Sequence, residues 1–170
     1  MKQFTKVLAA IALIVGMSSA MQAQSKVAHI NSQSLVEAMP TYKSAMSELE
    51  KLQKSYDAEI SSMGGELQKT LERYNREVDT QTDEENTRRM QEVQDTRSNI
   101  VKYQQGAMQK LEGKQQELIK PIIEKARLAI QKVARAKGFD FVLDSTPGAA
   151  GVIMADGYDL MPDAKASLGI

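Results

Sequence analysis

The chain has 170 residues, with 22 basic and 22 acidic side chains and neither cysteine nor tryptophan. This charge balance gives no general attraction to nucleic acid, and the lack of cysteine excludes disulfides, thiol chemistry and cysteine-based metal sites. Three Phe and five Tyr residues are too few for a large globular core. Abundant Gln, Glu, Lys, Met and Leu are instead typical of long, solvent-exposed helices.

Residues 1–23 have the pattern of a cleaved secretory signal. Lys2 and Lys6 precede an apolar run over 7–15, and small residues follow, so we expect cleavage after Ala20 or Ala23. The run is too short to span a bilayer. Cleavage would remove two lysines, leaving 20 basic against 22 acidic residues and a net charge of −2.

The mature chain is expected to begin with a small β segment. Residues 26–30 predict a strand, and Asn31 or Ser32 is suited to cap a short helix through Ala38. Pro40 interrupts this helix because the residue before a proline avoids the helical region. Thr41 is then the predicted cap of the next helix. Residues 24–40 are therefore assigned to a β body.

A long amphipathic pattern fills residues 41–137 and predicts an antiparallel helical hairpin, or arm. Residues 79–85 contain no apolar side chain and form the predicted tip, where Thr82 and Glu85 fit a capping box. On either side of the tip, apolar residues recur every three or four positions, as in a coiled coil. The outgoing seam is Met46, Leu49, Leu52, Tyr56, Ile60, Met63, Leu67, Leu71, Tyr74 and Val78.

The returning helix, expected over 84–137, changes character near its end. Pro121 lies about as far after the tip as Thr41 lies before it, so we expect it to mark where the arm meets the body. After Pro121, apolar residues cover more than one helix face. Residues 121–137 are therefore interpreted as a stem buried against the body or another subunit. Gly138 is the predicted left-handed end of the helix.

Residues 138–170 predict the second half of the body. Alternation over 139–143 predicts a strand, and residues 145–151 predict a turn. Residues 152–155 predict another strand, which residues 158–160 can extend. Residues 162–168 predict a short helix. Three short strands bury too little apolar surface to be stable alone. The sequence therefore favours an oligomer.

No arrangement of residues indicates catalysis or a bound cofactor. The only histidine, His29, lies in the first predicted strand and is interpreted as structural. Asp140, Asp144, Asp156 and Asp159 lack the spacing of a calcium loop and are interpreted as solvent-facing. Phosphate-loop, dinucleotide and hydrolase motifs are missing from the sequence. The chain is predicted not to be an enzyme.

The arm allows two interpretations. Its apolar residues either serve only the contact between its two helices, or some of them form an adaptable wall that contacts partners, a role for which methionine is well suited. The candidates for such contacts are Met46, Tyr56, Met63, Tyr74, Met90, Tyr103 and Met108. Glycines at 64, 65, 106 and 113 weaken the helices and should ease bending.

Three segments, one at the start of the mature chain and two from the end of the returning helix onward, resemble a known family. The mature chain opens with KVAHINSQSL at 26–35, and the returning helix closes with KPIIEKARLAIQKVA at 120–134 before KGFDFVLD at 137–144. Together with the coiled-coil hairpin between them, these segments resemble the Skp/OmpH family of periplasmic chaperones. The resemblance covers essentially the whole mature chain.

The resemblance implies a homotrimer in which three arms enclose a cavity around a shared β-barrel. It implies an α+β fold, ATP-independent holding of unfolded outer-membrane proteins in the periplasm, and no cofactor. The well-known members are strongly basic, whereas this chain is near neutral, which does not favour contact with membrane lipid or lipopolysaccharide. The expected oligomer interface is Val27, Ile30, Ile123, Ile130, Phe139, Phe141, Val142 and Val152.

The sequence leaves two classes of function open. One is the holdase just described. The other is a coiled-coil spacer or adaptor of the cell envelope, whose arms would present one defined apolar patch to one fixed partner.

Overall fold

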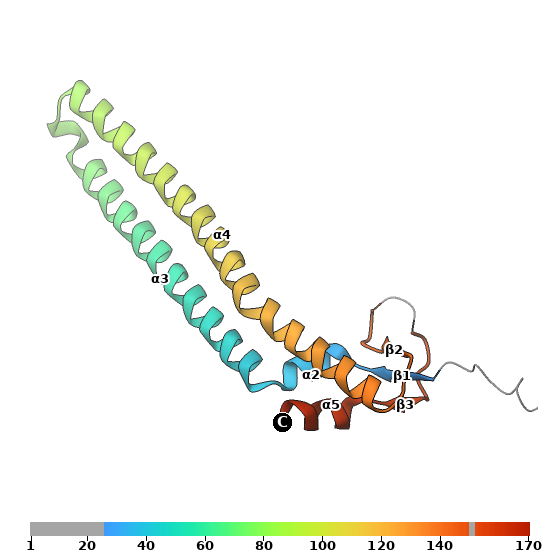
Figure 1. Ribbon diagram of the computed structural model, residues 1–170. Helices are drawn as coiled ribbons and strands as arrows, with labels where there is room; N and C mark the ends of the chain where they lie inside the picture. The colour runs from blue at the N-terminus through green and yellow to red at the C-terminus, as the bar shows by residue number, and fades with distance from the viewer. Residues whose placement is uncertain (1–25, 150–151) are drawn as a thin grey trace, which may run out of the picture.

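A computed structural model describes residues 26–149 and 152–170, and the signal sequence predicted at 1–23 lies outside them. Figure 1 shows a long helical hairpin that projects from a small body. The fold is α+β, as predicted. Its elements in chain order are β1 (Val27–Ile30), α2 (Ser32–Ala38), α3 (Pro40–Glu77), the 3-10 turn η1 (Val78–Thr80), α4 (Asp83–Ala136), β2 (Phe141–Asp144), β3 (Tyr158–Asp159) and α5 (Met161–Leu168).

The start of the chain forms the predicted strand and short helix. The side chain of Asn31 caps α2 by accepting a 2.8 Å hydrogen bond from the Ser34 N–H. The predicted cap at Thr41 is wrong, because α3 already begins at Pro40 and its N-cap is Met39. Proline fits the first helical position, where its missing N–H costs nothing, and it forces the preceding residue into an extended conformation.

The hairpin reverses direction within η1 and the residues that follow it. Thr82 caps α4 as predicted, accepting a 3.2 Å hydrogen bond from the Glu85 N–H. The second half of the capping box is not formed, because the Glu85 carboxylate binds Arg88 and Arg89 instead. Residues 83–85, predicted within the tip, are the first turn of α4, where acidic side chains face the positive end of the helix dipole.

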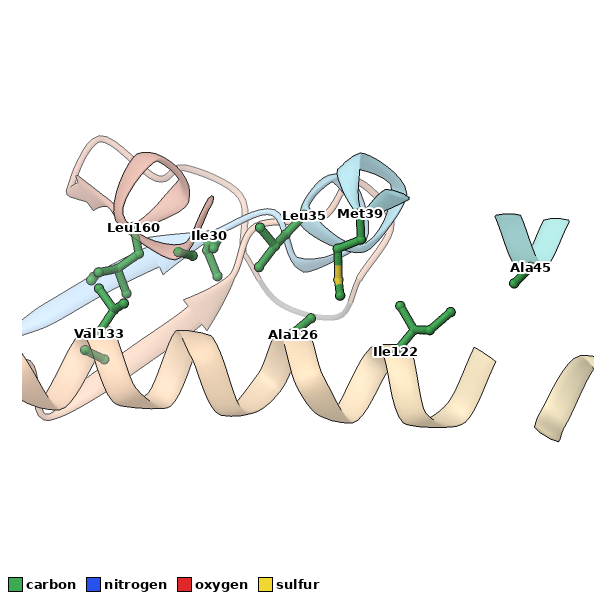
Figure 2. Close-up of a cluster of buried hydrophobic side chains, with 11 residues drawn as sticks. Ile30, Leu35, Met39, Ala45, Ile122, Ala126, Val133 and Leu160 are labelled. Carbon is green, nitrogen blue, oxygen red and sulfur yellow. The ribbon is translucent and has the colours of Figure 1, made fainter. Parts of the chain in front are cut away.

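Helix α4 continues past Pro121 into the body without a break in its assignment. Pro121 itself is exposed, whereas the next residue, Ile122, belongs to the buried cluster that includes Met39 and Ala45. Figure 2 shows Ile122 pointing from α4 toward Met39. The arm is thus joined to the body where α3 begins.

Gly138 ends the α4 segment in the predicted left-handed conformation, with φ of +74°. The N–H groups of Gly138 and Phe139 donate to the carbonyls of Arg135 and Ala134, at 3.1 and 2.9 Å, in the pattern of a Schellman motif. The chain then enters β2. This strand lies parallel to β1, with Val27 opposite Phe141 and Ile30 opposite Asp144.

The third strand is not where the sequence placed it. Residues 152–155, predicted as a strand, form none, and β3 is Tyr158–Asp159, which pairs in parallel with the other edge of β1. The strand order is β2-β1-β3. A chain that leaves β2 must cross back over the body before it can pair in parallel again. Of the described residues, 145–149 and 152–157 lie in that connection, and the predicted strand is among them.

A small apolar core joins the sheet, α2, α5 and the end of α4. Its largest fully buried side chains are Ile30, Leu35 and Leu160, and Figure 2 shows them on the side of α4 that carries Ala126 and Val133. Alanines on α4 leave room for the opposing elements to approach closely. The body is therefore a compact unit built from the segments before and after the arm, and the end of α4 packs along it.

Candidate functional site

One side of the arm is held by polar contacts between its two helices. Glu48 lies 3.3 Å from the Lys114 ammonium, Glu59 accepts a 2.6 Å hydrogen bond from Tyr103, and Glu77 lies 2.8 Å from the Arg89 guanidinium. The three glutamates are spaced by 11 and 18 residues on α3. Because a helix has about 3.6 residues per turn, these spacings place them on one line. We call this side of the hairpin the polar flank.

The contact nearest the tip centres on Arg89, whose side chain is only 12% exposed. Its guanidinium binds both Glu77 and Glu85 and lies over the Tyr74 ring, 4.6 Å from the centroid. One of its nitrogens, Nη1, is buried without a hydrogen-bond partner in the described residues. The Tyr74 ring supplies a cation–π contact to the same guanidinium. Hydrogen bonding from Arg88 lowers the pKa of Glu85 to about 2.

The middle of the arm holds a pair of tyrosines. The rings of Tyr56 on α3 and Tyr103 on α4 meet edge to face, with centroids 6.3 Å apart. The Tyr103 hydroxyl reaches Glu59, and this hydrogen bond raises the pKa of Tyr103 to about 12. These aromatic side chains therefore connect the two helices.

The opposite side of the arm carries exposed apolar side chains. Met90, Val101 and Met108 are spaced by 11 and 7 residues on α4 and lie on one line. Met90 and Met108 are 70% and 67% exposed. On α3, the exposed Met46 precedes Glu48 by two residues, which turns it about 200° away from the polar flank. We call the side formed by Met46, Val78, Met90, Val101 and Met108 the apolar flank.

Two open hollows lie along the apolar flank. The hollow near the body has a volume of about 630 Å³, and its apolar lining includes Tyr42, Met46, Leu49 and Leu111. The hollow near the tip has a volume of about 230 Å³, and its apolar lining includes Leu71, Val78, Met90 and Val93. Each hollow lies between α3 and α4 with a methionine in its lining. The arm thus presents, opposite the polar flank, a hollowed surface with exposed methionines and valines. Polar side chains such as Glu50 and Gln115 also line the hollow near the body.

The seven residues predicted for partner contacts separate into two groups. Met46, Met90 and Met108 are exposed on the apolar flank, whereas the others are half-buried: Tyr56, Met63, Tyr74 and Tyr103. Sequence reasoning did not include Val78 and Val101 as contact residues. The spacing of 11 residues between Met90 and Val101 is a signal that could have revealed the second of these.

The body has a second uncovered apolar surface, on the outer face of its sheet. Val27, Phe141 and Leu143 are exposed there, and Val27 and Phe141 are register partners on neighbouring strands. Phe141 is 58% exposed. Paired residues on adjacent strands point to the same face, so these side chains form one patch.

The residues predicted for the oligomer interface have different surroundings. Val27, Phe141 and Ile123 are exposed, whereas Ile30 is fully buried in the core of its own chain. The partly buried members that contact that core are Ile130, Phe139 and Val142. Val152 is half-buried within the crossover segment.

Polar residues of the body serve structural contacts. His29 Nδ1 lies 3.2 Å from the Ser145 hydroxyl, and the Asp144 carboxylate accepts from Ser32 and Thr146. Within residues 26–149 and 152–170, no three His, Cys, Asp or Glu side chains are grouped so that they could hold a metal ion. Among the helices described for this chain, none has the length and apolar character needed to cross a membrane.

Comparison with known proteins places these features in a family. The profile of the family described as "Outer membrane protein (OmpH-like)" matches residues 26–168. The chaperone protein Skp of Pectobacterium atrosepticum is 25% identical over 155 residues, covering 91% of this chain and 92% of that protein. Skp of Photorhabdus laumondii is 26% identical over 144 residues, covering 85% and 87%.

The fold also has a counterpart among solved structures. A crystal structure of an OmpH-like protein from Caulobacter crescentus CB15 superposes with a TM-score of 0.74 at 16% identity, covering 86% of this chain and 85% of that one. The family profile spans both ends of the body and the whole arm between them. This chain therefore belongs to the OmpH-like family, as its sequence predicted.

Proposed function

We propose that this protein is an ATP-independent periplasmic holdase, which keeps unfolded outer-membrane proteins from aggregating before they enter the membrane. The observation that carries the proposal is the apolar flank, which remains uncovered along an arm whose opposite side is polar. The Skp proteins that match nearly the whole chain are named chaperones, which supports the same function. The predicted signal sequence supports export to the periplasm.

The apolar flank suits a client that has no fixed structure. A helix that packed on it would need an apolar residue about every 3.5 positions, whereas Met90, Val101 and Met108 are separated by polar residues over two to three turns. An unfolded β-barrel protein exposes apolar side chains at alternate positions and adjusts its path freely. Sparse contacts with flexible methionines would hold such a chain and still allow its release.

A homotrimer would bring three such arms together. The exposed patch of Val27, Phe141 and Leu143 gives each body an apolar surface that another copy can cover. Joining three sheets in a shared barrel would also pair the open edges of β2 and β3.

The oligomer is tested with Phe141→Asp. Phe141 is exposed in the single chain, so the substitution should leave the fold intact but place a charge in the interface. We expect native mass spectrometry to show a trimer for the wild type and a monomer for the variant, with unchanged circular dichroism. A trimer that survives this substitution would contradict the assignment of the patch to the interface.

Client holding is tested by diluting an outer-membrane β-barrel protein from urea and recording light scattering. One equivalent of trimer should slow aggregation. Val101→Asp with Met108→Asp should weaken this protection, because both charges enter the apolar flank. The matched control is Asn99→Asp with Gln109→Asp, which places the same charges at exposed positions outside that flank. Equal protection by both variants would show that the flank does not contact the client.

The second candidate function is a structural spacer or adaptor. It is favoured by the polar contacts that hold α3 and α4 together, because a spacer needs an arm of fixed shape. Affinity capture from a periplasmic extract distinguishes the two functions. One stoichiometric partner would support the adaptor, whereas many unfolded β-barrel proteins would support the holdase.

A further inference from the structure

The apolar flank is rich in methionine, which is the residue type most open to reversible oxidation in a chain without cysteine. Met46, Met90 and Met108 are 43%, 70% and 67% exposed, whereas Met39 in the body is only 2% exposed. The flank also has valines at similar exposed positions, so its apolar character does not itself require sulfur. Its methionines therefore give the arm a chemistry that the rest of its apolar surface lacks.

We propose that Met46, Met90 and Met108 are reversible oxidation sites, and that their oxidation by hydroperoxides switches off binding of unfolded chains to the apolar flank. The thioether sulfur donates an electron pair to the outer peroxide oxygen. A sulfur–oxygen bond forms as the oxygen–oxygen bond breaks. The sulfur is oxidised by two electrons to the sulfoxide, and the second peroxide oxygen leaves as water from hydrogen peroxide or as an alcohol from an organic hydroperoxide.

The position of these methionines explains why oxidation would change binding and leave the fold intact. Sulfoxide is polar and chiral, so it replaces an apolar contact with a strong dipole. Met46 lines the hollow near the body and Met90 the hollow near the tip, so both hollows would become more polar. The contacts that join α3 to α4, such as the Tyr56–Tyr103 pair, lie elsewhere and would persist.

The structure provides its own controls for chemical reactivity. Met154 in the crossover segment is 76% exposed but lies off the arm, and Met63 is half-buried between the helices. Exposure should therefore set the rate of oxidation, while position on the flank should set its functional effect. The two can be separated because Met154 should react as readily as Met90 without affecting the arm.

The chemical part is tested by treating the native trimer with hydrogen peroxide and mapping sulfoxides by peptide mass spectrometry over time. We expect Met90, Met108 and Met154 to react first, Met46 next and Met39 last. The helix content seen by circular dichroism should not change. Oxidation of Met39 at the same rate as Met90, or loss of helix during oxidation of the flank, would overturn the proposal.

The functional part rests on the proposed holdase function, and it uses the same light-scattering assay before and after peroxide treatment. For the wild type, we expect the concentration that gives half-protection of the client to rise about tenfold. Incubation with methionine sulfoxide reductases should restore it. The variant Met46→Leu, Met90→Leu, Met108→Leu, compared with its own untreated sample, should be insensitive to peroxide, whereas Met154→Leu should lose protection like the wild type.

The possible failures are distinguishable. If the untreated wild type gives no protection, the holdase function is wrong. If the untreated protein protects the client but remains equally active with sulfoxide confirmed at all three methionines, the holdase stands and the oxidation switch is wrong. Sensitivity that persists in the triple leucine variant would also overturn the switch, because the effect would then arise elsewhere.

Discussion

The body and the arm differ in how far their apolar side chains are exposed to solvent. In the body, segments from before and after the arm pack together around Ile30, Leu35 and Leu160, which are almost fully buried. The arm has only two helices, so it buries a narrow seam and leaves methionines and valines on one flank. On the polar flank of the arm, Glu48, Glu59 and Glu77 of α3 make polar contacts with residues of α4. The body therefore contains most of the buried apolar contacts that stabilise the fold, whereas the arm exposes apolar side chains to solvent.

The largest expected effect that separates the two regions comes from Leu35→Ala. Leu35 is 0% exposed, so its truncation should leave a cavity and lower the free energy of unfolding by about 2–5 kcal/mol. The control is Leu67→Ala, at a half-buried position of the arm, where the loss should be smaller because water already reaches the site. Urea unfolding at a fixed chain concentration measures both. Equal losses would contradict the division between body and arm.

A second prediction concerns the stiffness of the arm. An added Cβ at Gly64 or Gly65 meets no atom within 4 Å, so Gly64→Ala with Gly65→Ala should fit without strain. Because glycine costs about 1 kcal/mol relative to alanine inside a helix, the pair should stabilise α3 by about 2 kcal/mol. Hydrogen exchange of amides in the middle of α3 should slow.

If the proposed holdase function is right and bending of the arm adjusts the space that holds a client, the same variant should hold a narrower range of client sizes. The control is Ser61→Ala with Ser62→Ala, which improves helix propensity less at neighbouring exposed positions. An unchanged spread of arm positions in solution scattering would show that the two glycines do not act as a hinge.

The sequence predicted those parts of the fold that depend on local chemistry. Asn31 and Thr82 cap helices as expected, and Gly138 has the expected positive φ, because each requires only its own neighbours. The prediction of a strand at 152–155 was wrong. The residue pattern of that segment contains no information about the direction in which a strand must run to pair with β1. The cap predicted at Thr41 was wrong because Pro40 is itself the first residue of the helix, which makes Met39 the N-cap.

The candidate site was only partly predictable for a similar reason. The sequence shows which residues of each helix are apolar, and it placed Met46, Met90 and Met108 among the candidates. Whether a residue lies in the seam or on a flank depends on how α3 and α4 are rotated against each other. That rotation is visible only in contacts between residues far apart in the chain, such as Tyr56 with Tyr103.

A smaller effect on the body is expected from acid. Burial raises the pKa of Asp144, but hydrogen bonds from Ser32 and Thr146 outweigh it and hold the pKa below its usual value. A lowered pKa stabilises the folded state above the unfolded pKa of about 4, and this contribution is lost as the pH falls through the folded pKa. The stabilities of wild type and Asp144→Asn should therefore converge in acid.

This convergence is measured by urea unfolding of both proteins from neutral pH into acid. Asp156→Asn is the matched control, because Asp156 is an exposed carboxylate of the same connection between β2 and β3. Its curve should run parallel to that of the wild type. A constant difference between wild type and Asp144→Asn at every pH would mean that the ionised carboxylate is not what holds β2 to the start of α2.

The smallest effect is expected in the arm, from Tyr103→Phe. The substitution keeps the ring contact with Tyr56 but removes the hydrogen bond to Glu59 that raises the pKa of Tyr103 to about 12. A raised tyrosine pKa means that this contact stabilises the fold below the unfolded pKa of about 10 and is lost as the pH rises toward 12. The wild type should therefore show a late step in tyrosinate absorbance that the variant lacks.

Tyr56→Phe is the control for this step, since it removes a hydroxyl from the same pair while leaving the bond between Tyr103 and Glu59 in place. The late step should persist in that protein. If it is absent from the wild type, the polar flank is not held at its centre in solution. The two helices would then be joined chiefly by their apolar seam, and the contrast between the two flanks would rest on the contacts at Lys114 and Arg89 alone.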